Sequence, residues 1–348
     1  LRPAPAPPAN VESLDRRPRQ HRNWQGAMRG LPAASCPAAL LRSAIWAACA
    51  AAAGALRPGR LRRSYRQTLH NFQNVQYFGD FGVGDQIIQG LADTGSWSFV
   101  VRSTRCEDCR HPTRPYNHSA SSTYRLGGVV SKLFYAAGNC RTFSGYDTVV
   151  AGQLKAVDYL IEEIEQHSIR ILDGAHYAAI VGLARASPDG AMTLPTAFGL
   201  DEFSVCFQKP SGLDGYLTWG PVANTSMQMG DYVSAAVLGR HHWMVPLHNV
   251  TLALSDGPAA PALCLGAGCS VTVDSGSSLI AAPPDALMYL SERIPIKTDC
   301  SNLQELPTLR FLLGGREFDL PPEAYVMRVT GTQEEVDAVY EILPVPPA

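Results

Sequence analysis

The sequence predicts an all-β protein with only a few short helices. Val, Thr, Tyr and Phe, which favour strands, cluster in short runs that Gly and Pro interrupt, and stretches with the 3.6-residue period of a helix are few. The 348 residues are enough for two packed lobes. A hydrophobic content of 46% against 17% charged residues indicates a globular protein with a sizeable core.

Net charge and cysteine spacing narrow the classes of function. A formal net charge of −2 gives no electrostatic footprint for nucleic acid, so we expect no nucleic-acid partner. The nine cysteines include two close pairs, Cys106 with Cys109 and Cys264 with Cys269. The other five have no near neighbour in the sequence, and their pairing stays open: Cys36, Cys49, Cys140, Cys206 and Cys300.

Three segments precede the predicted folded region. Residues 1–37, rich in Pro, Ala and Arg without hydrophobic periodicity, are expected to be disordered or a non-native leader. Residues 38–56 contain a run of 13 uncharged, mostly small apolar residues, which predicts a signal peptide core and the secretory pathway. An Ala-rich helix, a transit segment or a membrane anchor are the alternatives for that run. Residues 57–73 are predicted to be a basic pro-segment or a solvated linker.

Three N-glycosylation sequons agree with export. They begin at Asn117, Asn224 and Asn249. We therefore expect an exported glycoprotein.

The predicted folded region starts near Asn74 with a hairpin. Residues 76–84 alternate as a strand, turn at Gly84 and Asp85, and return through residues 87–92 to deliver Asp93. The phrase that starts there, Asp-Thr-Gly-Ser, has a near-copy in the Asp-Ser-Gly-Ser that starts at Asp274, and both follow apolar runs. One such phrase is an ordinary Asp-containing turn, but two in one chain exceed what residue usage alone predicts.

The first close cysteine pair has three interpretations. A zinc site needs four ligands at suitable spacing, and a thiol-redox motif should open a helix after a strand. Neither context surrounds Cys106 and Cys109, although His111 and His118 are near. A small local disulfide is therefore the favoured interpretation in an exported chain.

Beyond residue patterns, the chain resembles the pepsin-like aspartic peptidases, over roughly residues 70–330. The resemblance depends on the order and spacing of many short motifs. They are Tyr77–Gly79, the Asp93 phrase, the first cysteine pair, Ser121–Tyr124, Tyr135–Gly138, Gly145–Val149, Ile180–Leu183, Phe203–Val205, Tyr216–Gly220, the second cysteine pair ahead of Asp274, and Leu306–Tyr325.

The resemblance implies a two-lobed double β-barrel, with an N-terminal catalytic lobe at residues 74–207 and a C-terminal catalytic lobe at residues 208–348. It also implies an aspartic endopeptidase, made as a zymogen, that hydrolyses peptide bonds of proteins at acidic pH. Such an enzyme would be a monomer, secreted or held in a lysosome-like or vacuole-like compartment. It would need polypeptide substrates but no cofactor and no metal.

Site residues follow from the same resemblance. Asp93 and Asp274 would hold one water, with one carboxylate acting as base and the other carboxyl group as acid, as is general in this family. Tyr135 would lie on a flap that closes over the substrate. The remaining assignments are Thr94, Gly95, Ser96, Ser275, Gly276 and Ser277 as supporting residues, Ile171, Tyr177 and Ile180 as substrate pocket or core, and disulfides Cys106–Cys109 and Cys264–Cys269.

Several positions depart from the family pattern. Val100 stands where a Trp usually partners the flap Tyr, with Trp97 close by, and the flap carries Ala136 where Gly is usual. Ala178 and Ala179 replace the usual Asp-Gly, and the segment between Leu183 and Phe203 is compressed, so its helix is expected to be short.

The largest departure is at the C-terminus. Gly182 follows Asp93 by 89 residues, and the same offset from Asp274 gives position 363, beyond Ala348. Residues 334–348 contain no apolar-apolar-Gly strand, so we expect the second lobe to be truncated and Cys300 to have lost its disulfide partner. The alternative function is therefore a catalytically impaired pepsin-like protein that uses its cleft for binding.

Overall fold

The computed structural model describes residues 64–106, 109–110, 112–208, 212–221, 233–253, 260–264, 268–297 and 299–326. All of them belong to one compact unit, residues 41–348. The predicted leader (1–37), the predicted signal peptide (38–56), Asn224 and the 334–348 tail lie outside the described residues.

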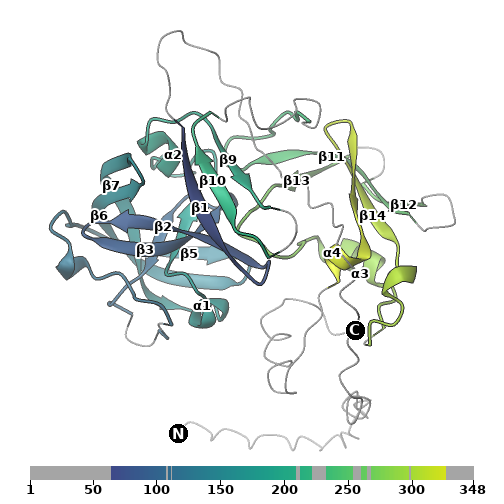
Figure 1. Cartoon of the computed structure of the whole chain (residues 1–348), viewed down its shortest axis with the longest axis horizontal. Coiled ribbons are helices and arrows are strands. Elements are labelled where there is room, and N and C mark those ends of the chain that lie inside the picture. Colours follow the sequence, from purple (N-terminus) through teal and green to yellow (C-terminus); the bar gives the residue numbers. More distant parts are fainter. Residues whose placement is uncertain are drawn as a thin grey trace, which may run out of the picture. The chain divides into compact units, whose positions relative to one another are not determined.

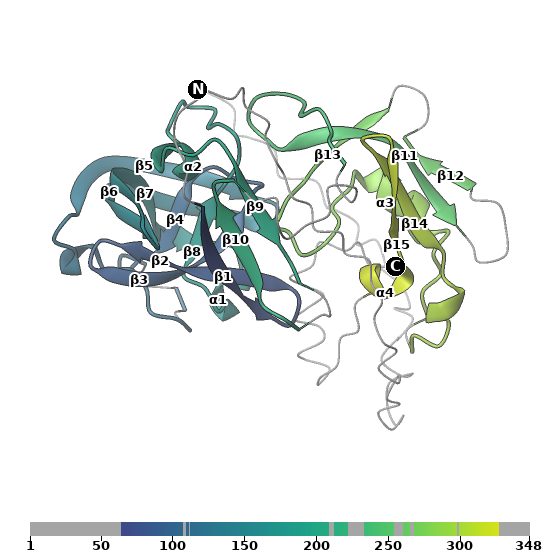
Figure 2. The same cartoon turned by 45° about the horizontal axis from the view of Figure 1, so that its top comes forward.

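Ten strands form the larger sheet, in the order β5-β6-β7-β4-β8-β3-β2-β1-β10-β9. Both cartoon views show β1 beside β10 (Figures 1 and 2). The strands are β1 (Tyr65–Phe72), β2 (Gln76–Val83), β3 (Gln86–Asp93), β4 (Phe99–Arg102), β5 (Arg125–Tyr135), β6 (Gly138–Ala151), β7 (Leu154–His167), β8 (Ala179–Gly182), β9 (Phe203–Cys206) and β10 (Gly215–Trp219). The helices between them are short: η2 (His118–Ala120), α1 (Ile171–Gly174) and α2 (Leu194–Ala197).

A second sheet contains five strands, in the order β12-β11-β14-β15 with β13 also paired to β11. These strands are β11 (Met244–Ala253), β12 (Ala260–Leu263), β13 (Cys269–Thr272), β14 (Thr308–Leu313) and β15 (Arg316–Leu320). Its helices are α3 (Pro284–Ser291), η4 (Leu303–Glu305) and α4 (Pro322–Tyr325). The prediction of a mainly β fold with few short helices is confirmed.

The first sheet extends past both of its predicted boundaries. β1 lies before the predicted start at Asn74, and its Tyr65–Leu69 portion pairs with β10. β10 itself lies beyond residue 207. In β1 the buried Gln67 and Leu69 alternate with exposed polar residues, as expected of a strand with one covered face.

The larger core holds the first sheet together. Phe81 packs edge-on against Phe99 at 6.0 Å and against Trp219 at 6.4 Å between ring centroids, and all three are buried. A separate buried cluster includes Leu91, Val100, Leu172, Tyr177 and Ile180. It packs beside the strand that carries Asp93, so this cluster connects the core to the site.

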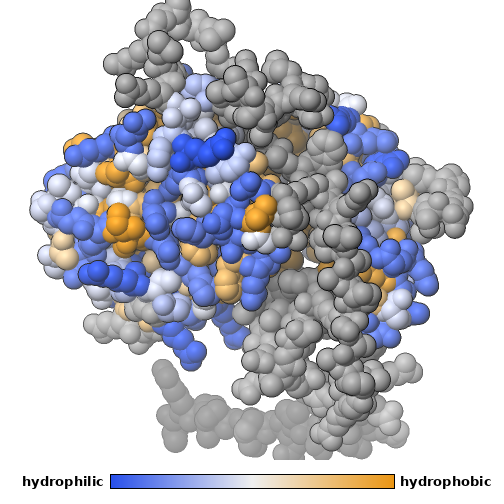
Figure 3. Space-filling view, viewed as in Figure 1, coloured by the Kyte–Doolittle hydropathy of each residue, from blue (hydrophilic) through white to orange (hydrophobic). Residues whose placement is uncertain are grey.

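The surface seen in Figure 3 mixes hydrophilic and hydrophobic residues. Of the helices in the described ranges, none has the length and apolar character needed to cross a membrane.

Candidate active site

Asp93 is the last residue of β3, and the neighbouring strand β8 supports it. β3 pairs in parallel with β8, which sets Asp93 opposite Gly182, and the Leu183 amide donates to the Asp93 carbonyl at 2.7 Å. A Cβ at Gly182 would overlap the backbone of Trp97, so only glycine allows this close approach. The compressed segment after Leu183 contains the four-residue helix α2, as short as expected.

The carboxylate of Asp93 is bound by its own loop. The Gly95 amide donates to Asp93 Oδ1 at 2.9 Å, and the Ser96 hydroxyl donates to Oδ2 in a short hydrogen bond. The residue is only 6% exposed. These two bonds fix the orientation of a buried carboxylate.

Asp274 has the same local arrangement after β13. The Gly276 amide donates to Asp274 Oδ1 at 2.8 Å, and the Ser277 hydroxyl donates to Oδ2 at 2.8 Å. The preceding Val273 amide donates to the carbonyl of Trp243 at 3.0 Å. Asp274 is half-buried, so this carboxylate is more open to solvent than Asp93.

Two hydroxyl residues join the loops. The Thr94 amide donates to Ser275 Oγ at 3.1 Å, and the Ser275 amide donates to Thr94 Oγ1 at 2.9 Å. Each hydroxyl also donates across the pair, Thr94 to the Val273 carbonyl at 2.8 Å and Ser275 to the Ala92 carbonyl at 2.6 Å. The four bonds fix one Asp loop against the other.

A glycine in each loop faces the carboxylate of the other loop. A Cβ added at Gly95 would lie 2.5 Å from Asp274 Cγ, and one added at Gly276 would overlap Asp93 Oδ1. Real Cβ atoms do not approach other atoms so closely. Glycine at both positions therefore lets the two carboxyl groups come together.

Burial raises the pKa of Asp93 most, and the neighbouring charge of Asp274 raises it further. The hydrogen bonds from Ser96 and Gly95 stabilise the ionised form and oppose this rise. A proton is therefore retained at this site to a higher pH than on an isolated aspartate.

Both carboxylates open into a cavity of about 560 Å³. The predicted flap residue Tyr135 lines it, at the tip of the β5–β6 hairpin. Burial, with smaller effects from Cys140 and Asp93, raises the pKa of Tyr135, so its hydroxyl stays protonated. The predicted pocket residues Ile171, Tyr177 and Ile180 also line the cavity.

Tyr177 and Ile180, which line the cavity, also belong to the buried cluster.

Val100, which stands where a Trp is usual, and the nearby Trp97 lie in different surroundings. Val100 is fully buried in the core cluster. Trp97 lines the cavity and its ring lies 5.1 Å from that of His242. Neither His242 nor Lys132, which also lines the cavity, was predicted from the sequence, because each reaches the site from a strand or loop without a recognisable motif.

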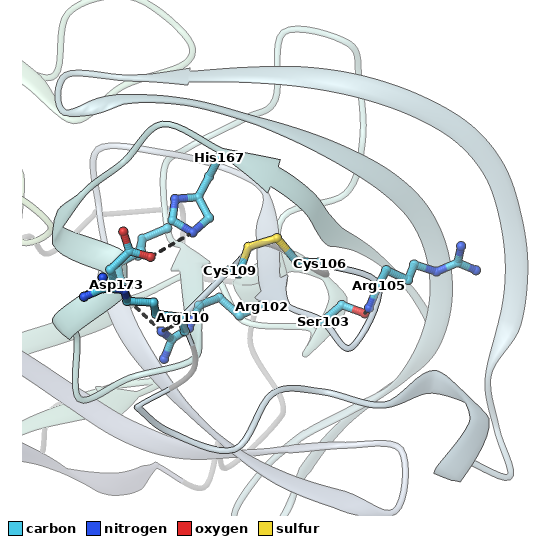
Figure 4. The surroundings of a disulfide bond; sticks show 9 residues. Arg102, Ser103, Arg105, Cys106, Cys109, Arg110, His167 and Asp173 are labelled. Atoms are coloured by element: carbon cyan, nitrogen blue, oxygen red, sulfur yellow. Dashed lines mark hydrogen bonds and ion pairs between the residues drawn. A yellow bond between two sulfur atoms is a disulfide. The ribbon is translucent and has the colours of Figure 1, made fainter.

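The structure contains the disulfides Cys106–Cys109 and Cys264–Cys269. Figure 4 shows the first one with Arg102, Ser103 and Arg105 around it. Cys140, Cys206 and Cys300 are free thiols, and Cys36 and Cys49 lie outside the described residues. Within the described ranges, no three His, Cys, Asp or Glu side chains are grouped to hold a metal ion.

The chain is similar to known proteins over most of its length. The model of the eukaryotic aspartyl protease family matches residues 76–339. Gastricsin of Macaca fuscata fuscata is 29% identical over 280 residues, which cover 75% of this chain and 73% of the relative. Cathepsin D of Dictyostelium discoideum is 29% identical over 286 residues, covering 75% and 73%. Pepsin A of Bos taurus is 26% identical over 285 residues, covering 76% and 74%.

Proposed function

Because the chain belongs to the eukaryotic aspartyl protease family, and is thus an aspartic-type endopeptidase acting on polypeptides, we propose that Asp93 and Asp274 are its catalytic pair. The observation that carries this proposal is the matched set of contacts around the two carboxylates. Each accepts one amide and one hydroxyl hydrogen bond from its own loop, and each faces the glycine of the other loop.

The two carboxyl groups supply complementary proton transfers. The ionised carboxylate takes a proton from the bound water, and the oxygen of that water attacks the peptide carbonyl carbon. The protonated partner donates its proton to the carbonyl oxygen, which gives a tetrahedral diol. As the C–N bond breaks, the carboxyl group that took the water proton gives it to the leaving nitrogen, and its partner takes a proton back from a diol hydroxyl. Repulsion between two negative charges at one site keeps one proton on the pair, and the raised pKa of Asp93 supports that state.

The flap and the pocket are proposed to handle the substrate. Tyr135, at the hairpin tip, closes over the peptide and excludes water from the carboxylates. Ile171, Tyr177 and Ile180 form an apolar wall that receives an apolar substrate side chain.

We propose acidic conditions as the working environment, because the pair must retain one proton to act as both acid and base. The predicted signal peptide and family membership support the secretory pathway as the location. A monomer is proposed, since one chain supplies both carboxylates.

Protein digestion tests this function. Casein or haemoglobin should be cleaved at about pH 3–5, and a statine-type inhibitor should block the cleavage. Asp93→Asn and Asp274→Asn should each abolish this cleavage. Val129→Ala, a change at an exposed residue of the β5–β6 hairpin, should not. Full activity in Asp93→Asn or in Asp274→Asn would rule out the mechanism. Tight inhibitor binding by a wild-type chain that cleaves nothing would favour the binding-protein alternative.

A further inference from the structure

Arg102, at the end of β4, is a buried cation with an unusual set of partners. It is 1% exposed, and its charge is not used by the proposed proton transfers. Its five side-chain hydrogen bonds end on neutral oxygens, four backbone carbonyls and the Thr113 hydroxyl. Burying a charge costs free energy unless other groups compensate for it. A buried arginine is therefore expected to have a structural or functional role.

Three of those carbonyls belong to one short segment. The guanidinium donates to Leu172 O at 2.6 Å, to Ala175 O at 3.5 Å and to Tyr177 O at 2.6 Å. The Arg102 amide also donates to Ala178 O at 2.7 Å. One residue therefore binds four carbonyls between residues 172 and 178.

This segment is a wall of the cavity. Leu172 and Tyr177 line it, together with Ile169, Ile171 and Ile180. The segment continues directly into β8, the strand paired with Asp93. Its shape thus affects both the apolar wall and the support of one proposed catalytic carboxylate.

The guanidinium also links this wall to the disulfide loop. It donates to the Arg110 carbonyl at 3.3 Å, and Arg110 directly follows Cys109 of the Cys106–Cys109 disulfide. Figure 4 shows Arg102, Arg110 and the disulfide together with Asp173. Burial lowers the pKa of Arg102, and the charges of Tyr177 and Asp173 offset part of that effect. The four N–H groups on the two terminal nitrogens of Arg102 serve these oxygens, whereas the three donors of a lysine ammonium can serve only some of them.

We propose that Arg102 is a positioning residue that sets the enzyme's preference for large apolar substrate side chains, by holding the 172–178 wall in place. The proposal rests on the proposed function, since it requires the cavity to be the substrate pocket. Without the guanidinium the buried carbonyls lose their donors, and the segment shifts to find others. An apolar wall displaced by a fraction of an ångström discriminates poorly between side chains of different size.

The test compares peptides that differ in one side chain next to the cleaved bond, either alanine or phenylalanine. We expect the ratio of kcat/KM for the phenylalanine peptide to that for the alanine peptide to fall about tenfold in Arg102→Met. The fall should appear mainly in KM, and Arg102→Lys should restore part of it. Binding of statine-type inhibitors with the same two side chains should show the same loss, independently of turnover.

Arg105→Met is the matched control. Arg105 lies in the loop that follows β4, and its Nε is 3.5 Å from the buried carboxylate of Glu163. It does not line the cavity. Its loss should lower stability but leave the ratio unchanged. If Arg102→Met does not fold, the ratio in Arg102→Lys decides.

An unchanged ratio in a folded Arg102 variant, with an active wild type, overturns the positioning role alone. A wild type that cleaves neither peptide and binds neither inhibitor overturns the proposed function, and this inference with it.

Discussion

Thr94 and Ser275 exchange hydrogen bonds, each accepting the backbone amide of the other through its hydroxyl oxygen, at 3.1 and 2.9 Å. The two residues are 181 positions apart in the sequence. This reciprocal contact fixes the distance between the loops that carry Asp93 and Asp274. Any loss of it should therefore affect stability and activity together.

Removing these hydroxyls tests their coupling. Thr94→Val and Ser275→Ala should each lower the free energy of unfolding by about 1–3 kcal/mol, because partners in a mostly buried site lose hydrogen bonds. The double variant should lose less than the sum of the two, because each hydroxyl makes its own two bonds but all four join the same two loops, so loosening one pair weakens the other. Urea titrations measure all three.

Thr218→Val is the control for this cycle. Thr218 is buried in β10, and its hydroxyl has no hydrogen-bond partner among the described residues, so the change should leave stability unchanged or raise it. Strict additivity of Thr94→Val and Ser275→Ala would contradict the coupling between the two pairs of hydrogen bonds.

The two facing glycines give a second prediction. Gly95→Ala places a Cβ 2.5 Å from Asp274 Cγ, so one carboxylate must move. A displacement of about 1 Å in a catalytic group can cost about a hundredfold in rate, and we expect kcat/KM to fall at least that much. Gly276→Ala should behave alike, because its Cβ meets Asp93.

Gly199→Ala is the glycine control: a Cβ there meets no atom within 4 Å, and although its φ of +70° makes alanine costly to stability, Gly199 does not line the cavity. Its kcat/KM should equal that of the wild type. Full activity in Gly95→Ala would show that the carboxylates need not be as close as they are here.

The pH dependence of stability gives a third prediction. The folded state raises the pKa of Asp93, so it favours the protonated carboxyl. The stabilisation is complete below the pKa of the unfolded chain, about 3.9, and is lost as the pH rises through the folded pKa. Asp93→Asn removes this loss of stability at higher pH, because asparagine does not ionise. Its side-chain oxygen still accepts a hydrogen bond from the Gly95 amide. Its Tm should therefore exceed that of the wild type at neutral pH, by about 2–4 °C per kcal/mol, and match it near pH 3.

Thermal melts across this pH range, with Asp158→Asn as the control, measure the effect. Asp158 is exposed and pairs with Arg125 at 2.9 Å, so its replacement should bring no gain at neutral pH. A Tm difference for Asp93→Asn that stays constant with pH would contradict the raised pKa.

Local sequence patterns predicted the parts of this protein that depend on neighbours in the chain. The alternation in residues 76–92 predicted the β2–β3 hairpin, because strand alternation and a Gly84 turn are local properties. β1 was missed, because its buried positions are one polar and one apolar residue, Gln67 and Leu69, and its partner over Tyr65–Leu69 is the distant strand β10.

The sequence by itself determined the mainly β fold and the two Asp-hydroxyl-Gly phrases, because residue preference, spacing and turn chemistry are encoded within a few positions. Only the tertiary structure decided that Gly95 faces Asp274, that Thr94 binds Ser275, and that Arg102 holds the carbonyls of the pocket wall. Those contacts join residues 70 to 181 positions apart. Chain folding sets such contacts through the packing of whole sheets, which no short stretch of sequence specifies.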